Sequence, residues 1–130
     1  MSADTSGLRY TRDHEWARGQ GAEVVVGITQ YAQDALGDIV FVDLPAVGRR
    51  VAQGDAVAEV ESTKTVAQVM APVAGEVVAV NTGLGDHPET VNTDPYGAGW
   101  FFRLRMDDPE ALGALMDEAA YGAHVEEVSR

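Results

Sequence analysis

Apolar positions recur in short runs along the chain, and Gly, Pro, Asn and Asp separate these runs. Residues 22–28 and 38–44 are rich in β-branched and aromatic side chains, which is typical of buried strands. Between them, Thr29 is placed to cap a helix and Gly37 is placed to end it in a left-handed conformation. The pattern therefore predicts a short helix over residues 30–36 between two strands.

Residues 47–80 consist of two similar halves that meet at Lys64. In each half, short apolar stretches alternate with turn residues, which is typical of a flattened barrel or sandwich of strands. Lys64 lies between two of these stretches, and this position predicts a hairpin with Lys64 at its exposed tip.

The last part of the chain is predicted to contain a long loop, a strand and a helix. Residues 81–99 are rich in Gly, Pro, Asn, Asp and Thr, which indicates a surface loop, and loops of this length are usually functional or docked. Residues 100–106 are predicted to form a strand, because Phe102, Leu104 and Met106 alternate with Arg103 and Arg105. Asp108 is placed to cap a helix that has Pro109 at its first position. The buried stripe of this helix is predicted at Leu112, Leu115, Met116 and Ala119.

Length and composition indicate one soluble domain. The chain has 130 residues, of which 45% are hydrophobic, enough to form a core. No apolar run approaches the roughly 18 residues of a membrane span, and the first residues lack the features of a secretory signal. We expect residues 1–7 to be disordered and residues 8–130 to form a single domain, with a C-terminal helix from about residue 108.

Charge and residue types exclude several classes of function. The formal net charge of −12 makes nucleic acid and anionic membranes poor partners. The same charge favours encounter with basic patches on proteins, although a plain solvated surface is an equal alternative. Cysteine is absent, which excludes disulfides, zinc–thiolate sites and a cysteine nucleophile. His14 precedes Glu15, and such a pair would suggest acid–base chemistry. No second histidine follows at metal-site spacing, which excludes a zinc protease motif. His87 and His124 are expected to be exposed.

Lys64 is the only lysine in the chain, because eight of the nine basic residues are arginine. A genome biased toward arginine codons would explain the scarcity of lysine, but not the position of the one that remains. Arginine is not an acylation target, whereas the primary amine of lysine is a usual site of covalent modification. Lys64 is therefore the candidate attachment site.

Several segments resemble the H-protein family of the glycine cleavage system, and the likeness extends from about Leu8 to Tyr121. In chain order they are residues 10–16 (YTRDHEW), 26–32 (VGITQYA), 36–45 (LGDIVFVDLP), 60–64 (VESTK), 71–77 (APVAGEV) and 91–100 (VNTDPYGAGW). The resemblance implies a mainly β, lipoyl/biotinyl-type barrel sandwich (hybrid hammerhead) with short flanking helices and a C-terminal helix.

The resemblance also implies a cofactor and partners. Lipoate would be attached to Lys64 by an amide bond. A pyridoxal-phosphate glycine decarboxylase (P protein) would load an aminomethyl group, a folate-dependent aminomethyltransferase (T protein) would unload it, and dihydrolipoyl dehydrogenase (L protein) would reoxidise the dithiol. A lipoylating enzyme would be a further partner. We expect a monomeric carrier without catalytic turnover of its own, in the bacterial cytoplasm, or in the mitochondrial matrix if this is a processed chain.

Further residues are expected to belong to the attachment site. The matching segments include Ser62 and Thr63, which directly precede Lys64. Glu61, like Glu59, would orient Lys64 or dock the lipoylating enzyme, with an ordinary solvated strand residue as the alternative. Gly75 is expected to allow a tight turn or a left-handed backbone and so to position the hairpin.

Glu15 is the candidate to pair with the amine of the loaded arm, with a plain surface carboxylate as the alternative. Trp16 is expected to serve packing. Residues 10–16 and 81–99 are the predicted walls of a cleft that would shield the arm from water.

The chain departs from the family after Lys64, and other functions stay open. The family usually has small residues and then Ser-Asp, whereas this chain has Thr65-Val66-Ala67-Gln68, so an acid is missing four residues past Lys64. One alternative is an H-like lipoyl donor or a carrier for other lipoate-dependent systems, although a bare dehydrogenase domain would lack the flanking segments. A biotin carrier normally has Met beside its lysine, where this chain has Thr. A binding or structural β-domain that is never modified is the remaining alternative.

Overall fold

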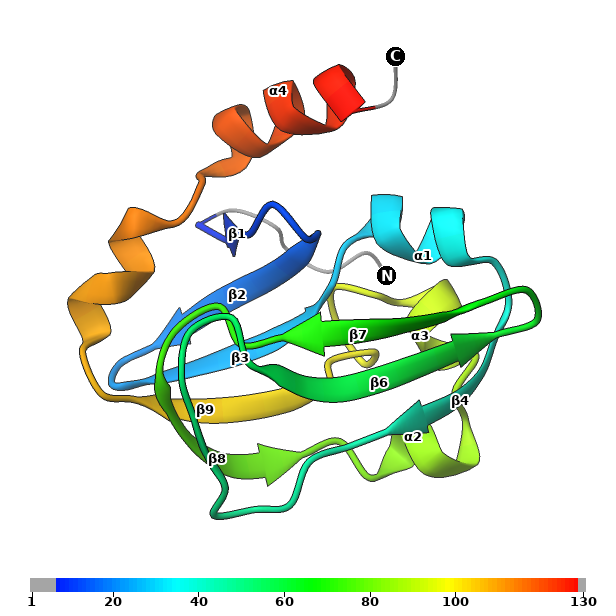
Figure 1. Cartoon of the computed structure of the whole chain (residues 1–130), viewed down its shortest axis with the longest axis horizontal. Coiled ribbons are helices and arrows are strands. Elements are labelled where there is room, and N and C mark those ends of the chain that lie inside the picture. The colour runs from blue at the N-terminus through cyan, green and yellow to red at the C-terminus, as the bar shows by residue number, and fades with distance from the viewer. Residues whose placement is uncertain (1–6, 129–130) are drawn as a thin grey trace.

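Two antiparallel sheets enclose the main core of the structure, a computed structural model that describes residues 7–128 (Figure 1). The larger sheet has the order β1 (Arg9–Tyr10), β2 (Glu15–Gln20), β3 (Glu23–Ile28), β9 (Phe102–Met106), β8 (Gly75–Val80), β5 (Arg50–Val51). The smaller sheet has the order β4 (Ile39–Asp43), β6 (Ala56–Ser62), β7 (Val66–Met70). Of the predicted disordered segment 1–7, residues 1–6 lie outside the described range and Gly7 lies in a turn.

Side-chain alternation explains which strand faces meet the core. In β9, Phe102, Leu104 and Met106 are buried while Arg105 is exposed, as the sequence predicts. Strand β3 shows no such alternation because both of its faces are covered. Val24 and Val26 contribute to the main core, and Val25 packs in a second cluster with Leu8, Tyr10, Trp16 and Tyr121. Trp16 is fully buried, which confirms its predicted packing role.

Helix α1 (Gln30–Leu36) has the predicted bounds and caps. The Thr29 hydroxyl accepts a hydrogen bond from the Ala32 amide, and the Gly37 amide donates to the Gln33 carbonyl. Gly37 has φ of +84°, a left-handed value that favours glycine. The helix thus ends sharply, and the chain turns directly into β4.

Residues 81–99 are not the predicted surface loop. They contain two single-turn helices, α2 (Gly83–Asp86) and α3 (Thr90–Thr93). Leu84 of α2 and Val91 of α3 are 1% and 0% exposed and belong to the main core. The prediction was wrong because each helix contributes one isolated apolar anchor, which shows no periodicity in the sequence.

The C-terminal segment is not one continuous helix from residue 108. Asp108 does act as a cap, since its side chain accepts from the Glu110 amide, but the helix that follows is a 3-10 helix (Pro109–Ala114). The chain then extends, and Met116 forms a bridge with Tyr10 before α4 (Glu118–Val128) begins. Long-range pairing with β1 therefore divides the predicted helix.

The predicted stripe of this helix is accordingly only partly correct. Leu112, Leu115 and Met116 are half-buried, while Ala119 is exposed. The buried residue of α4 is Tyr121, whose ring stacks on Tyr10 with the centroids 4.5 Å apart. Within residues 7–128, no helix has the length and apolarity needed to cross a membrane.

Candidate functional site

Lys64 lies at the tip of the hairpin that joins β6 to β7, and it is exposed, as predicted. Figure 1 shows this tip projecting at one side of the molecule, beside α1 and the start of β4. The Cε atom of Lys64 lies 3.4 Å from the point that a Cβ atom on Gly37 would occupy. A Cβ atom at position 37 would therefore be in ordinary van der Waals contact with the lysine stem, so it is the positive φ of Gly37, and not a clash with Lys64, that favours glycine there.

Hydrogen bonds of Ser62 hold the turn that presents Lys64. The Ser62 amide donates to the Thr65 carbonyl at 2.8 Å, and the Ser62 hydroxyl accepts from the amides of Lys64 (3.3 Å) and Thr65 (3.1 Å). The Thr63 amide donates to the Asp38 carbonyl at 3.1 Å and so ties the tip to the start of β4. Ser62 and Thr63 thus position Lys64 within an ordered turn.

Asn92 is a supporting residue that the sequence analysis did not single out. Its side-chain amide donates to the Gly37 carbonyl (2.8 Å) and to Gln33 Oε1 (2.9 Å), and its Oδ1 accepts from the Ile39 amide (2.9 Å). These bonds fix the turn against which the Lys64 stem lies. The available signal was that Asn92 lies within the family-like segment 91–100.

Gly75 has a different role from the predicted one. It lies in β8 opposite Met106, and its backbone is not left-handed. A Cβ atom at this position would lie 2.3 Å from the Arg105 carbonyl oxygen, so glycine allows β8 to approach β9 closely. Gly75 belongs to the larger sheet, whereas the Lys64 turn belongs to the smaller one.

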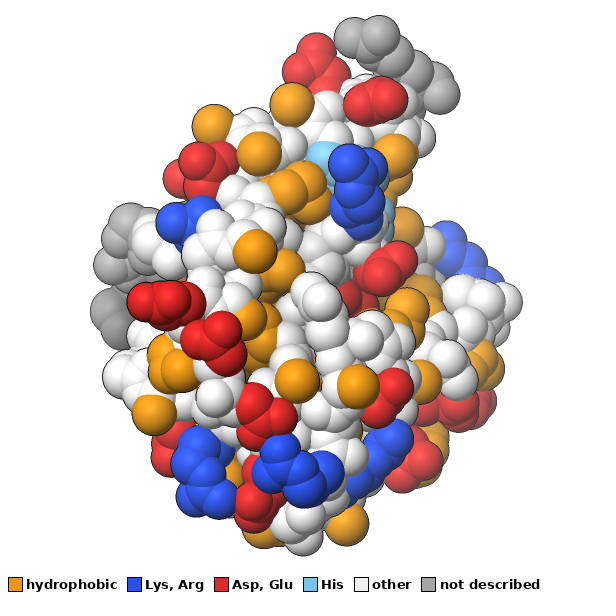
Figure 2. Space-filling model, turned by 60° about the vertical axis from the view of Figure 1, so that its left-hand side comes forward, with side chains coloured by type: hydrophobic (Ala, Val, Ile, Leu, Met, Phe, Trp, Pro, Cys, Tyr) orange, Lys and Arg blue, Asp and Glu red, His pale blue; other side chains and the backbone are white. Residues whose placement is uncertain are grey.

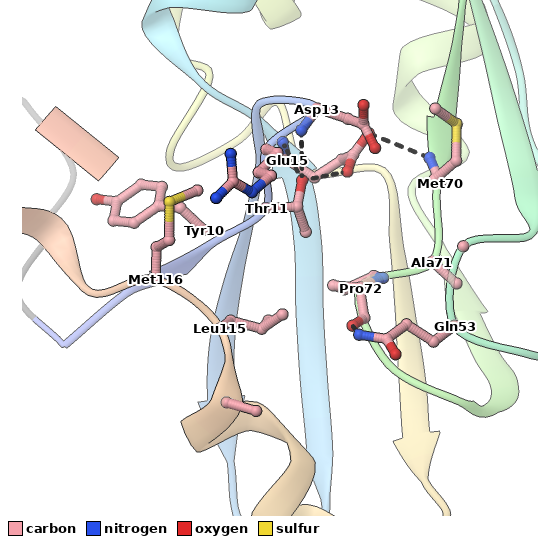
Figure 3. Close-up of a pocket in the computed structure, with 13 residues that line it drawn as sticks. Tyr10, Thr11, Asp13, Glu15, Gln53, Met70, Ala71, Pro72, Leu115 and Met116 are labelled. Atoms are coloured by element: carbon pink, nitrogen blue, oxygen red, sulfur yellow. Dashed lines mark hydrogen bonds between the residues drawn. The ribbon is translucent and has the colours of Figure 1, made fainter. Parts of the chain in front are cut away.

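Glu15 is a buried carboxylate, with 1% of its surface exposed. Figure 3 shows its two hydrogen bonds: the Thr11 hydroxyl donates to Oε1, and the Met70 amide donates to Oε2 at 3.2 Å. Burial raises the pKa of Glu15 to about 7, because removing a carboxylate from water outweighs the stabilisation from these two donors. The alternative of a plain surface carboxylate is therefore wrong.

A groove of about 190 Å³ lies along β7 between the Lys64 turn and Glu15. Its apolar lining comes from Ile28, Ala32, Ala35, Leu36, Val60, Ala67 and Val69. Leu36 directly precedes Gly37 at the lysine end, and Glu15 contacts the Met70 amide at the far end of β7. The groove thus runs along β7 from Leu36, next to the glycine on which the Lys64 stem packs, to the buried Glu15.

Only part of the predicted cleft wall forms this groove. Residues 13–15 line it, whereas residues 81–99 do not. Asn92 from that segment instead donates to the carbonyl of Gly37, next to the groove residue Leu36. Gln68 lines the groove at the position of the missing acid, but Asp13 lines it as well. The groove therefore retains two carboxylates, Asp13 and Glu15. Glu15 also lines a hollow of about 280 Å³ on its other side, shown in Figure 3.

Helix α4 holds the turn that carries Glu15. His14 has φ of +70°, and its Nδ1 lies 2.8 Å from the Tyr121 hydroxyl, which in turn lies 2.7 Å from Thr29 Oγ1. His124 Nε2 lies 3.0 Å from the Arg12 carbonyl oxygen. His124 is half-buried, whereas the sequence predicted that it would be exposed. Burial is the largest cause that lowers the pKa of His14, and the nearby His124 lowers it further.

Ion pairs engage several basic side chains of the larger sheet. Arg50 and Arg105 both pair with Glu76, and Arg50 also pairs with Asp107. Figure 2 shows one face of the molecule, on which basic side chains gather mainly at the lower edge while acidic ones are spread more widely. A net charge of −12 with pairing of this kind leaves much of the surface acidic.

Comparisons with known proteins agree on one family. A family model described as "Glycine cleavage H-protein" matches residues 8–128. A relative from Myxococcus xanthus named "Glycine cleavage system H protein" is 56% identical over 116 residues, which cover 89% of this chain and 90% of the relative. A relative of the same name from Thermus thermophilus is 58% identical over 112 residues, which cover 86% and 88%.

A solved structure supports the same likeness. The crystal structure of a glycine cleavage system H protein from Mycobacterium marinum matches with a TM-score of 0.80 and 43% identity, covering 95% of this chain and 97% of that one. The predicted fold class, a mainly β barrel sandwich with short helices and a C-terminal helix, is confirmed.

Proposed function

The chain belongs to the glycine cleavage H-protein family, and from this premise we propose that it is a lipoyl carrier of the glycine cleavage system, with lipoate attached to Lys64. The observation that carries the assignment of the site is the position of the only lysine. Lys64 is exposed at the tip of an ordered turn, and the groove that starts beside it ends at a buried carboxylate.

The residues present fit the cofactor. An amide on Lys64 would be neutral, so the lysine stem and its acyl chain would lie on the apolar wall formed by Leu36 and Ala67 without burying a charge. When bound, lipoate supplies a disulfide that is reduced as it takes up a group from one enzyme and hands it to the next. The chain itself presents the arm, shelters it from water and orients it.

Glu15 is proposed to bind the amine that the arm carries. Glu15 lines the groove, and its carboxylate is almost wholly out of contact with water, which strengthens its attraction for a cation. Since its pKa is about 7 in the free chain, an arriving ammonium group would favour the ionised form and release a proton below that pH. Asp13 in the same groove adds negative charge.

The proposed partners are the P protein, the T protein, the L protein and a lipoylating enzyme. The acidic surface supports encounter with basic patches on such proteins. The bacterial relatives support the bacterial cytoplasm as the place of action. As a carrier component, the purified lipoylated chain should not decarboxylate glycine on its own.

Exchange of labelled bicarbonate into glycine tests this function. The lipoylated chain, mixed with glycine decarboxylase, should support exchange in proportion to its concentration, while the unmodified chain should support none. A chain that is lipoylated on Lys64 but supports no exchange with an active decarboxylase would contradict the proposal. That result would favour the alternative of an H-like lipoyl donor.

Ser62→Ala should slow lipoylation severalfold because it removes the hydroxyl that accepts from the Lys64 and Thr65 amides. The free energy of unfolding should also fall by about 1 kcal/mol, the usual net value of such bonds. The measurements are the initial rate of lipoyl incorporation, followed by intact mass, and urea denaturation. Ser62→Asn is the matched control, since an Asn side chain accepts from the same turn amides. Equal rates for Ser62→Ala and the unaltered chain would contradict the positioning role.

A further inference from the structure

Exposed apolar side chains cluster beside the Lys64 turn. Among residues 7–128, the large hydrophobic side chains with high exposure are Val40 (49%), Phe41 (53%), Val47 (61%), Val66 (52%) and Val128 (48%). Single exposed apolar residues are common and need no explanation. Phe41 and Val66, however, come from separate strands of the smaller sheet, and Val66 lies two residues past Lys64.

Strand register brings Phe41 and Val66 into one row with Glu61 between them. Phe41 of β4 is opposite Glu61 of β6, and Glu61 is opposite Val66 of β7. Residues directly opposite each other share a face of the sheet, with Cβ atoms about 5 Å apart. The next set in register, Val42, Val60 and Ala67, points to the main core instead. We call the set Phe41, Glu61 and Val66 the outer row.

The outer row combines apolar side chains with a free charge. Glu61 is exposed, and no described residue forms an ion pair or hydrogen bond with its side chain. Two residues back along β6, Glu59 lies between Asp43 and Gln68. These three residues and Arg49 line one hollow. A partner that fits the outer row therefore needs an apolar surface with a basic side chain placed for Glu61.

The reach of the lysine indicates which partner covers the outer row. An unmodified lysine extends only its four-carbon stem from the turn. An enzyme that acylates Nζ must therefore bring its active site up to the turn, and it covers the ends of β6 and β7 when it does so. Enzymes that act on the end of the finished arm can reach it from farther away. We propose that Phe41 and Val66 form the docking surface for the lipoylating enzyme on the unmodified chain.

This inference rests on the proposed lipoylation of Lys64. In that step an amide bond forms between Lys64 Nζ and the lipoyl carbonyl carbon, the bond from that carbon to its activating group breaks, and the amine loses a proton. The enzyme supplies the activated lipoate, an acyl adenylate or a thioester. The outer row takes no part in the bond changes. Substitutions in it should therefore weaken binding of the lipoylating enzyme and leave the chemical step unchanged.

The test is the dependence of the initial lipoylation rate on the concentration of the unmodified chain. Lipoate, ATP and a lipoate ligase from the same organism as the chain are supplied, and product is followed by intact mass. Phe41→Ser and Val66→Thr should each raise KM for the chain about 5- to 20-fold, the range for loss of a central apolar contact, while kcat stays within about twofold. Val47→Thr, an equally exposed site outside the outer row, is the matched control and should leave KM unchanged.

Separate outcomes distinguish this inference from the function on which it rests. If the unaltered chain gains no lipoyl group, the proposed function fails and the docking surface fails with it. If the unaltered chain is lipoylated and both variants keep its KM, only the docking surface is overturned. Loss of bicarbonate exchange by fully lipoylated variants, with an unchanged KM for lipoylation, would likewise overturn it in favour of the decarboxylase. Val66→Thr keeps a β-branched side chain, so the test stands if Phe41→Ser fails to fold.

Discussion

Lys64→Arg should abolish lipoylation and glycine–bicarbonate exchange while leaving the fold unchanged. Arginine keeps the positive charge and a similar stem, but its guanidinium is not an acylation target. Position 64 is exposed, so the free energy of unfolding should change by less than about 0.5 kcal/mol. Intact mass, the exchange assay and urea denaturation measure the three effects.

A lysine placed elsewhere tests whether position matters. In the Lys64→Arg background, Arg49→Lys restores one exposed lysine on the loop before β5. It should not be lipoylated, because it lacks the turn formed by Ser62 and Thr65. Lipoylation of this second lysine at a comparable rate would show that exposure alone is sufficient, against the role given to the turn.

Glu15→Gln should remove a pH dependence of stability. The pKa of Glu15 is about 7 in the folded chain, against 4.5 for an ordinary Glu, so the folded state binds the extra proton between these values. The free energy of unfolding therefore falls as the pH rises from about 4.5 through 7, by up to roughly 3 kcal/mol. Gln carries no charge, so the variant should match the unaltered chain near pH 4.5 and exceed it by up to this amount at pH 8.

The same variant should expose the loaded arm to hydrolysis. At pH 8 the Glu15 carboxylate attracts the amine, and Gln lacks this attraction, so the loaded arm should hydrolyse about tenfold faster. In the unaltered chain this protection should weaken as the pH falls below about 7, because Glu15 becomes protonated. Glu61→Gln, an exposed carboxylate outside the groove, is the control. Identical hydrolysis rates for Glu15→Gln and the unaltered chain at pH 8 would contradict the amine-binding role.

Local signals explain which elements were predictable. The bounds of α1 follow from Thr29 and Gly37, whose capping chemistry involves only nearby backbone atoms. The helices α2 and α3 were missed because Leu84 and Val91 anchor single turns without any repeat. The break before α4 was missed because it depends on the pairing of Met116 with Tyr10, more than a hundred residues earlier in the chain.

The same distinction applies to the candidate site. Lys64 was identifiable because it is the only lysine and lies between two apolar stretches. The burial of Glu15 was not, since it depends on the Met70 amide and on packing against residues far away in sequence. Gly75 shows a related limit: a close approach to the Arg105 carbonyl and a left-handed turn both require glycine, and only the structure distinguishes them.

Attachment of lipoate to Lys64 is tested by an intact mass and a peptide map after expression with lipoate and lipoylating enzymes from the same organism as the chain. A single lipoyl increment is expected, located on the peptide that contains Lys64. A chain that stays unmodified under these conditions, or that carries the increment on another amine, would contradict it.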